Sequence, residues 1–158
     1  MMDAAMTDIE RTAIEDTQTW LMQAVVGLNL CPFAKAVVVK DMVRYRVCTS
    51  AEPADLLAML REELKHLAEA DPEQLDTTLL IAPHALPDFL DFNDFLSDCD
   101  AVLQDLALDG VLQVADFHPR YQFGGTATLR LRNFMRSKPK RCASALDEST
   151  NSLRVSMP

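Results

Sequence analysis

The stretch TTLLIAPHALPDFLDFNDFLSDCDAVLQDLALDGVLQVADF, residues 77–117, contains the pattern that decides the fold. Its first six residues are a short apolar run bounded by turn-forming residues, which is typical of a buried strand. Residues 88–107 then place apolar side chains on one face at helical spacing, with aspartates on the opposite face. Gly110 ends the following loop, and residues 111–117 predict a second strand. Strand, helix and strand in this order predict parallel strands joined by a helical crossover.

Two further helices are predicted upstream of this stretch. Thr7 is followed three residues later by Glu10, which forms a capping box, and the apolar spacing that follows predicts a helix over residues 8–27. The leucines of residues 53–70 share one face of another helix. The fold class we predict is therefore α/β: a single domain with a mixed three- or four-stranded sheet packed by about three helices.

The segment after the first helix allows two interpretations. The β-branched runs at residues 36–40 (AVVVK) and 43–49 (VRYRVCT) predict a hairpin, although Asp41–Met42 is a poor two-residue turn. The alternative continues a helix from Pro32 through Val39. We favour the hairpin.

Length and composition indicate one domain in a reducing compartment. The chain has 158 residues, of which 49% are hydrophobic, and no apolar stretch reaches the roughly 18 residues of a membrane span. The N-terminus is acidic where a secretory signal would be basic and then apolar, so we expect a cytoplasmic protein with its four cysteines as thiols. No two cysteines lie within four residues of each other, which excludes a C-x-x-C redox or zinc motif.

Charge is distributed unevenly along the chain. Residues 126–158 carry seven Lys or Arg against two Asp or Glu, a net charge of +5, whereas residues 1–125 carry eight against 22, a net charge of −14. The acidic main domain is a poor partner for nucleic acid or for an anionic membrane. A small molecule remains a candidate partner, and a sheet with few strands leaves exposed edges that a homodimer could cover.

Four strings in the chain carry a family resemblance. They are GLNLCPFAKA (27–36), DTTLLIAP (76–83), DFLDFNDFL (88–96) and GVLQVADFHPRYQF (110–123). In this order they resemble the bacterial family called domain of unknown function 1415, from about Thr17 to Gly125. The resemblance assigns the chain to a family but implies no reaction, because that family has no established activity. Its most recognisable strings contain Asn29, Cys31, Pro32, His118, Pro119, Tyr121 and Gln122.

The sequence departs from the family pattern after Gly125. Members of the family continue into a polar loop, a segment containing Pro-Tyr-Pro and a closing helix, whereas residues 126–158 here lack clear periodicity and reverse the charge balance. We therefore divide the chain into a domain of residues 1–125 and an atypical basic tail of residues 126–158. A shifted reading frame is the explanation we favour for the tail. The alternative is a genuine basic, disordered tail that touches nucleic acid or the acidic domain itself.

Cys31 is the first candidate for chemistry. Pro32 after it predicts that Cys31 is the N-cap of a short helix, where the helix dipole and free backbone N–H groups favour the thiolate. Lys35 would add positive charge one turn later. The alternative is that Cys31 is a small buried hydrophobic residue.

His118 is the second candidate, because it directly follows a predicted strand and active-site groups of open α/β sheets gather at the carboxyl ends of strands. It could act as a general base, as a partner of Cys31 or as a metal ligand. Arg120, Tyr121 and Gln122 add a cation, a phenol and an amide to the same loop. The alternative is an ordinary loop histidine bonded to backbone.

Three function classes follow. A non-catalytic domain that binds a small molecule or a protein is the one we favour. The second is a small-molecule enzyme with Cys31 as nucleophile or redox thiol and His118 as base, and the third is a metal site built on the same two residues. The predicted binding residues are Asn29, Lys35, Arg120, Tyr121 and Gln122. No motif identifies a cofactor, since the chain lacks a Gly-rich phosphate loop, a G-x-S-x-G elbow and an H-E-x-x-H helix.

Overall fold

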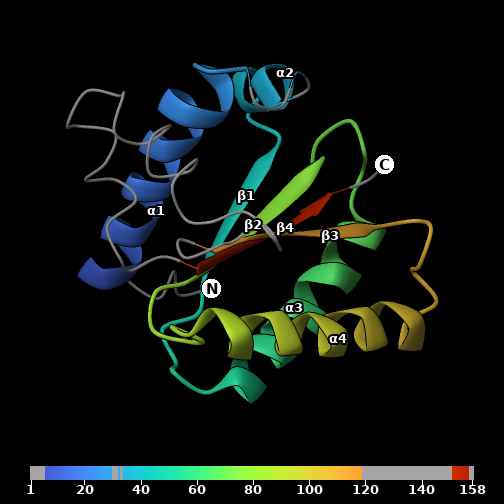
Figure 1. The fold of residues 1–158 in the computed structure, drawn as a ribbon. Helices are drawn as coiled ribbons and strands as arrows, with labels where there is room; N and C mark the ends of the chain where they lie inside the picture. The colour runs from blue at the N-terminus through green and yellow to red at the C-terminus, as the bar shows by residue number, and fades with distance from the viewer. Residues whose placement is uncertain (1–5, 30–31, 33, 119–150, 157–158) are drawn as a thin grey trace, which may run out of the picture.

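The computed structural model describes residues 6–29, 32, 34–118 and 151–156, the last range by its backbone alone. The elements follow one another as α1 (Asp8–Trp20), the π-helix η1 (Leu21–Val26), α2 (Ala34–Val39), β1 (Val43–Val47), α3 (Pro53–Glu69), β2 (Thr77–Ala82), α4 (Phe89–Asp105), β3 (Gln113–Phe117) and β4 (Asn151–Ser156). Figure 1 shows the sheet between two groups of helices, with α1 and α2 on one face and α3 and α4 on the other. None of the helices in these described ranges is long and apolar enough to cross a bilayer.

The sheet has four strands in the order β1-β2-β4-β3. β1 pairs with β2 in parallel, and α3 is the crossover between them. β4 pairs antiparallel with both β2 and β3. The predicted mixed α/β fold is therefore confirmed, but β2 and β3 are not neighbours, because a strand from near the end of the chain lies between them.

The fully buried strand β2 divides the core into two layers. Leu80 and Ala82 contact the large cluster that α3 and α4 form with their apolar faces. Leu79 and Ile81 point to the opposite side, into the clusters formed with α1, η1 and β1. Alternation along the strand thus supplies both faces of the sheet with apolar side chains, which explains why β2 reads as a continuous apolar run.

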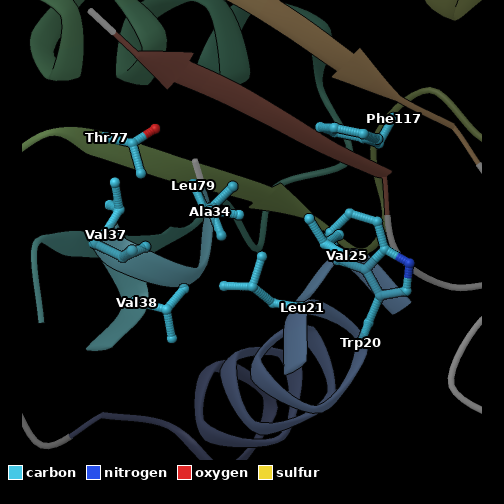
Figure 2. A pocket seen from close by; sticks show the side chains of 10 residues that line it. Trp20, Leu21, Val25, Ala34, Val37, Val38, Thr77, Leu79 and Phe117 are labelled. Carbon is cyan, nitrogen blue, oxygen red and sulfur yellow. The ribbon is translucent and has the colours of Figure 1, made fainter. Parts of the chain in front are cut away.

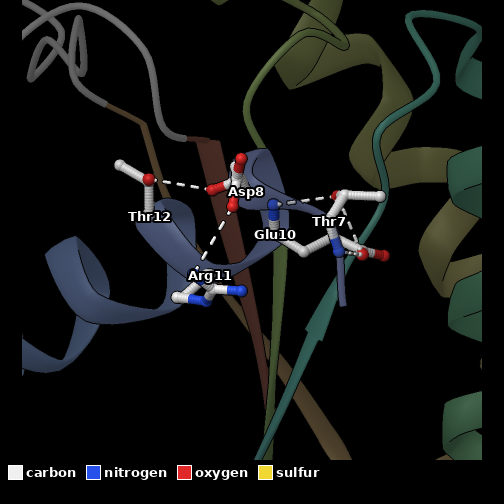
Figure 3. A network of polar contacts seen from close by, with 5 residues as sticks. All are labelled: Thr7, Asp8, Glu10, Arg11 and Thr12. Carbon is white, nitrogen blue, oxygen red and sulfur yellow. Dashed lines mark hydrogen bonds and ion pairs between the residues drawn. The ribbon is translucent and has the colours of Figure 1, made fainter. Parts of the chain in front are cut away.

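The helix α1 begins at the predicted capping box (Figure 3). The Thr7 hydroxyl accepts the Glu10 N–H at 3.3 Å, and the Glu10 carboxylate accepts the Thr7 N–H at 2.8 Å and its hydroxyl at 2.9 Å. These hydrogen bonds stabilise the ionised carboxyl, so they lower the pKa of Glu10. The predicted helix over residues 8–27 is thus present, with its last turn in π-helical form.

The predicted hairpin over residues 36–49 is wrong. The alternative holds instead, because Ala34–Val39 is the helix α2 and Val43–Val47 pairs with β2. Asp41 ends α2 in the left-handed conformation, with φ at 56°, and the N–H groups of residues 41 and 42 bond the carbonyls of residues 38 and 37. This pattern is a Schellman motif, and an aspartate tolerates its left-handed position better than most residues. Asp41–Met42 is unfavourable as a two-residue hairpin turn but favourable at the end of a helix.

Candidate functional site

A cavity of about 220 Å³ lies between the sheet and the α1 side of the molecule (Figure 2). Among the described residues it is lined by Trp20, Leu21, Val25, Ala34, Val37, Val38, Val43, Thr77, Leu79 and Phe117. These side chains come from α1, η1, α2 and three strands of the sheet. The cavity is therefore a product of the tertiary structure, and no single segment could form it.

The helix α2 supplies one wall through its amphipathic spacing. Ala34, Val37 and Val38 lie on the face that lines the cavity, whereas Val39 points away and is 75% exposed. The opposite wall is the sheet, where Thr77 and Leu79 lie two residues apart on β2 and therefore point to the same face. The small side chain of Ala34 leaves space next to Leu79, with which it shares a buried cluster.

The π-helix η1 supplies a third wall through Leu21 and Val25. Wider i to i+5 hydrogen bonding, here from the Gly27 N–H to the Met22 carbonyl at 3.0 Å, changes the direction in which side chains leave the helix. A side chain at Gly27 would place its Cβ only 2.5 Å from the Gln23 carbonyl oxygen, so this turn requires glycine. Short π-helical segments occur frequently at functional sites, and this one borders the cavity.

An aromatic pair lies at one end of the cavity. The rings of Trp20 and Phe117 meet edge to face, with centroids 5.2 Å apart and planes at 68°. Trp20 is the last residue of α1 and Phe117 the last residue of β3, so the pair joins the helix layer to the edge of the sheet. Phe117 is 37% exposed and Trp20 is partly exposed, which puts this end of the cavity at the surface.

The described lining is apolar apart from the Thr77 hydroxyl and the indole N–H of Trp20, and it includes no charged side chain. Burying an ion in such surroundings is strongly unfavourable unless the ion is paired. These residues can therefore hold an uncharged apolar molecule, and they supply no acid, base or nucleophile for a reaction.

His118 lies on the other side of the sheet from the cavity. Its ring contacts Phe89 and Phe92 of α4, at centroid distances of 5.5 and 4.9 Å, and its Nε2 lies 3.2 Å from the Leu86 carbonyl oxygen. The residue is 6% exposed. The ring therefore links the end of β3 to the loop before α4. A contact with a backbone carbonyl is what the alternative interpretation, an ordinary loop histidine bonded to backbone, predicts.

The other predicted site residues fall into two groups. Asn29 and Lys35 are exposed on either side of the short segment between η1 and α2, and neither lines the cavity. Cys31, Arg120, Tyr121 and Gln122 lie outside the described residues. The pairing of Cys31 with His118, as a catalytic or a metal-binding pair, stays a prediction. Within the described ranges, no group of three or more metal-ligating side chains comes together.

Sequence reasoning missed the charged cluster around Glu63. This residue is 3% exposed on α3, and its carboxylate lies 2.8 Å from Arg44 Nε and 3.0 Å from Arg46 Nε on β1. The signal was present, because Glu63 falls within the apolar stripe between Leu60 and Leu67 at helical spacing. A glutamate inside an apolar stripe indicates a buried partner of opposite charge.

The described cysteines are buried and free. Burial raises the pKa of the Cys48 thiol, and burial together with the neighbouring carboxylates of Asp100 and Asp98 raises the pKa of Cys99 to about 12. Neither thiol forms a reactive thiolate at neutral pH, because each is protonated there.

Comparison with known proteins identifies a family. A family model described as Protein of unknown function (DUF1415) matches residues 12–146. The matched range extends beyond Gly125 into residues 126–146 of the basic tail, and the interpretation of the tail as frame-shifted stays a prediction. No curated protein and no solved structure matches the chain.

Proposed function

Because the chain belongs to the DUF1415 family, whose description assigns no function, we propose a function from the geometry of the cavity: this is a domain that binds a small, uncharged, apolar molecule between η1, α2 and the sheet. The observation that carries the proposal is a cavity of about 220 Å³ whose described walls are apolar and uncharged.

The size of the cavity supports a ligand. A cavity of about 150 Å³ with similar walls binds benzene, so this one has room for a somewhat larger molecule.

The enzyme and metal interpretations have less support. Both depend on Cys31 and His118, and His118 lies across the sheet from the cavity, against α4. The binding domain is the class for which the described residues supply a site.

We also propose that the protein resides in the cytoplasm. The free thiols of Cys48 and Cys99 support this location. Fractionation of the source cells tests it, and recovery of the protein in an exported fraction would contradict it.

Methyl NMR of the full chain tests the binding function. Titration with naphthalene, toluene and cyclohexane is expected to shift the methyl signals of Val25, Val38 and Leu79, with quenching of fluorescence from Trp20, the chain's single tryptophan. The variant Ala34→Leu fills the cavity from α2 and is expected to weaken binding at least tenfold. Val39→Leu changes an exposed residue of the same helix and is the matched control.

Two results would contradict the proposal. One is the absence of any saturable shift of the cavity methyl groups with any of these compounds. The other is unchanged binding in a folded Ala34→Leu variant, because this substitution removes the space that the ligand needs. The folding of each variant is checked by its thermal unfolding.

A further inference from the structure

We propose that the ligand of this cavity is a planar aromatic compound about the size of two fused rings, without a formal charge. The inference rests on the proposed function and adds the chemical class of the ligand. Three properties of the cavity carry it: the aromatic pair at one end, the volume and shape of the space, and the absence of charge in its described lining.

The aromatic pair selects for aromatic ligands. Trp20 and Phe117 meet edge to face, so each ring still presents part of its surface to the cavity that both residues line. A ring that enters this end can add edge-to-face or offset contacts with them, which a saturated molecule of equal size cannot make. Each such contact strengthens binding by roughly two- to tenfold beyond the burial of apolar area.

The layout of the lining residues favours an elongated molecule. Figure 2 shows the lining residues in a band along the sheet, with Trp20 and Phe117 at one end and Thr77 and Val37 at the other. The band lies between the face of β2 and the walls formed by η1 and α2. Since benzene occupies a cavity of about 150 Å³, the additional space in 220 Å³ corresponds to roughly one more fused ring.

The electrostatics of the described lining disfavour a charged ligand. These residues are aliphatic, aromatic or hydroxyl-bearing, and none of them carries a charge opposite to a carboxylate or an ammonium group. A charged group on the ligand would lose its hydration with little compensation, since the aromatic rings offer an ammonium group only a cation–π contact of about 0.5–2 kcal/mol. We therefore expect a neutral ring system, with any polar substituent directed to the exposed end at Phe117.

Calorimetric titration with compounds that share one ten-carbon skeleton tests the inference. The full chain is titrated with naphthalene, with its saturated counterpart decalin, and with the anion 2-naphthoate. We expect naphthalene to bind at least about tenfold more tightly than decalin, and 2-naphthoate to bind more weakly than naphthalene by a similar or larger factor.

Two variants show whether the aromatic pair is responsible. Phe117→Leu keeps an apolar side chain and removes the ring, so the preference for naphthalene over decalin should fall to about threefold or less. Phe89→Leu makes the same substitution in α4, where the ring contacts His118 and does not line the cavity, so the preference should stay at its original value.

The outcomes separate this inference from the function on which it rests. Equal affinity for naphthalene and decalin, or tight binding of 2-naphthoate, would overturn the aromatic, neutral ligand and leave a general apolar binding domain. A preference that persists in Phe117→Leu would also overturn the role of the aromatic pair. Failure of every compound to bind would overturn both proposals.

Discussion

At the scale of single residues, burial decides the chemistry of the described thiols. Cys99 is 1% exposed on the apolar face of α4, with Asp98 and Asp100 beside it in the sequence. Loss of hydration and the nearby negative charge both oppose the thiolate, so the pKa of Cys99 rises to about 12. The sequence placed Cys99 on the apolar face, but only the packed structure shows how strongly its ionisation is suppressed.

We expect Cys99 to resist alkylation across the neutral and mildly alkaline range. A thiol reacts as its thiolate, and with a raised pKa the protonated form of Cys99 dominates until the pH approaches about 12. At pH 8.5 its rate in native protein should be at least about a thousandfold below that of a free thiol, whose pKa is about 8.5. Mass spectrometry of iodoacetamide-treated protein measures the rate at each cysteine.

The same alkylation experiment provides its own controls. In guanidinium chloride all four cysteines should react at similar rates, since unfolding removes the burial. Rapid modification of Cys99 in native protein would show that its surroundings are not closed to solvent. The alkylation rate of Cys31 is measured in the same samples. A pH dependence of that rate with an apparent pKa below about 8.5 would support the prediction that Cys31 is a nucleophile.

At the scale of elements, a buried carboxylate holds the edge strand to a helix. Glu63 of α3 faces Arg44 and Arg46, which lie on the same face of β1. The Arg44 contact is a hydrogen-bonded ion pair, whereas the Arg46 Nε lies close to the carboxylate without an aligned hydrogen bond. These ion pairs fix the position of β1 relative to α3, because burying the Glu63 carboxylate without its arginine partners would cost free energy of folding.

Glu63→Gln is expected to lower the free energy of unfolding by about 1 to 3 kcal/mol. The value lies below the 3 to 5 kcal/mol typical of broken buried pairs, because the Arg44 and Arg46 side chains are 36% and 41% exposed and water can hydrate them. Asp105→Asn is the matched control: it removes an exposed ion pair with Arg61 between α4 and α3 and should cost less than about 0.5 kcal/mol. Urea unfolding at pH 7 measures both, and equal costs would contradict the prediction.

At the scale of the whole molecule, the sheet depends on a strand from near the end of the chain. β4 pairs along its length with β2 and with β3, so it joins the two halves of the sheet. Without it, the inner edges of both strands would lose their hydrogen-bond partners, and such edges promote aggregation. Residues 151–156, which fall within the predicted basic tail, thus form an inner strand of the sheet.

Truncation after residue 150 is expected to abolish cooperative thermal unfolding or to leave an aggregating protein. A chain of residues 1–156, which lacks two residues beyond β4, should melt as the full chain does. Leu153→Pro tests the same point in the intact chain, because a proline in a central strand removes a ladder hydrogen bond. Circular dichroism melting measures all three, and an unchanged melt of the 1–150 chain would contradict the role of β4.

Features that depend on neighbours along the chain could be predicted from the amino-acid sequence. The capping box at Thr7, the apolar faces of α3 and α4 and the buried strand β2 could all be predicted, because helical and strand periodicities are local properties. The hairpin failed where local signals conflicted, since β-branched valines are compatible with both α2 and a strand.

The tertiary structure alone decided which distant segments meet. The insertion of β4, the partners of Glu63 and the contact of Trp20 with Phe117 join residues far apart in the sequence, and no periodicity encodes such pairings. The cavity is the clearest case, because its lining residues have the same apolar spacing as core residues that pack without a gap. Whether apolar faces close on one another or leave a space depends on the volumes and angles of all the elements together.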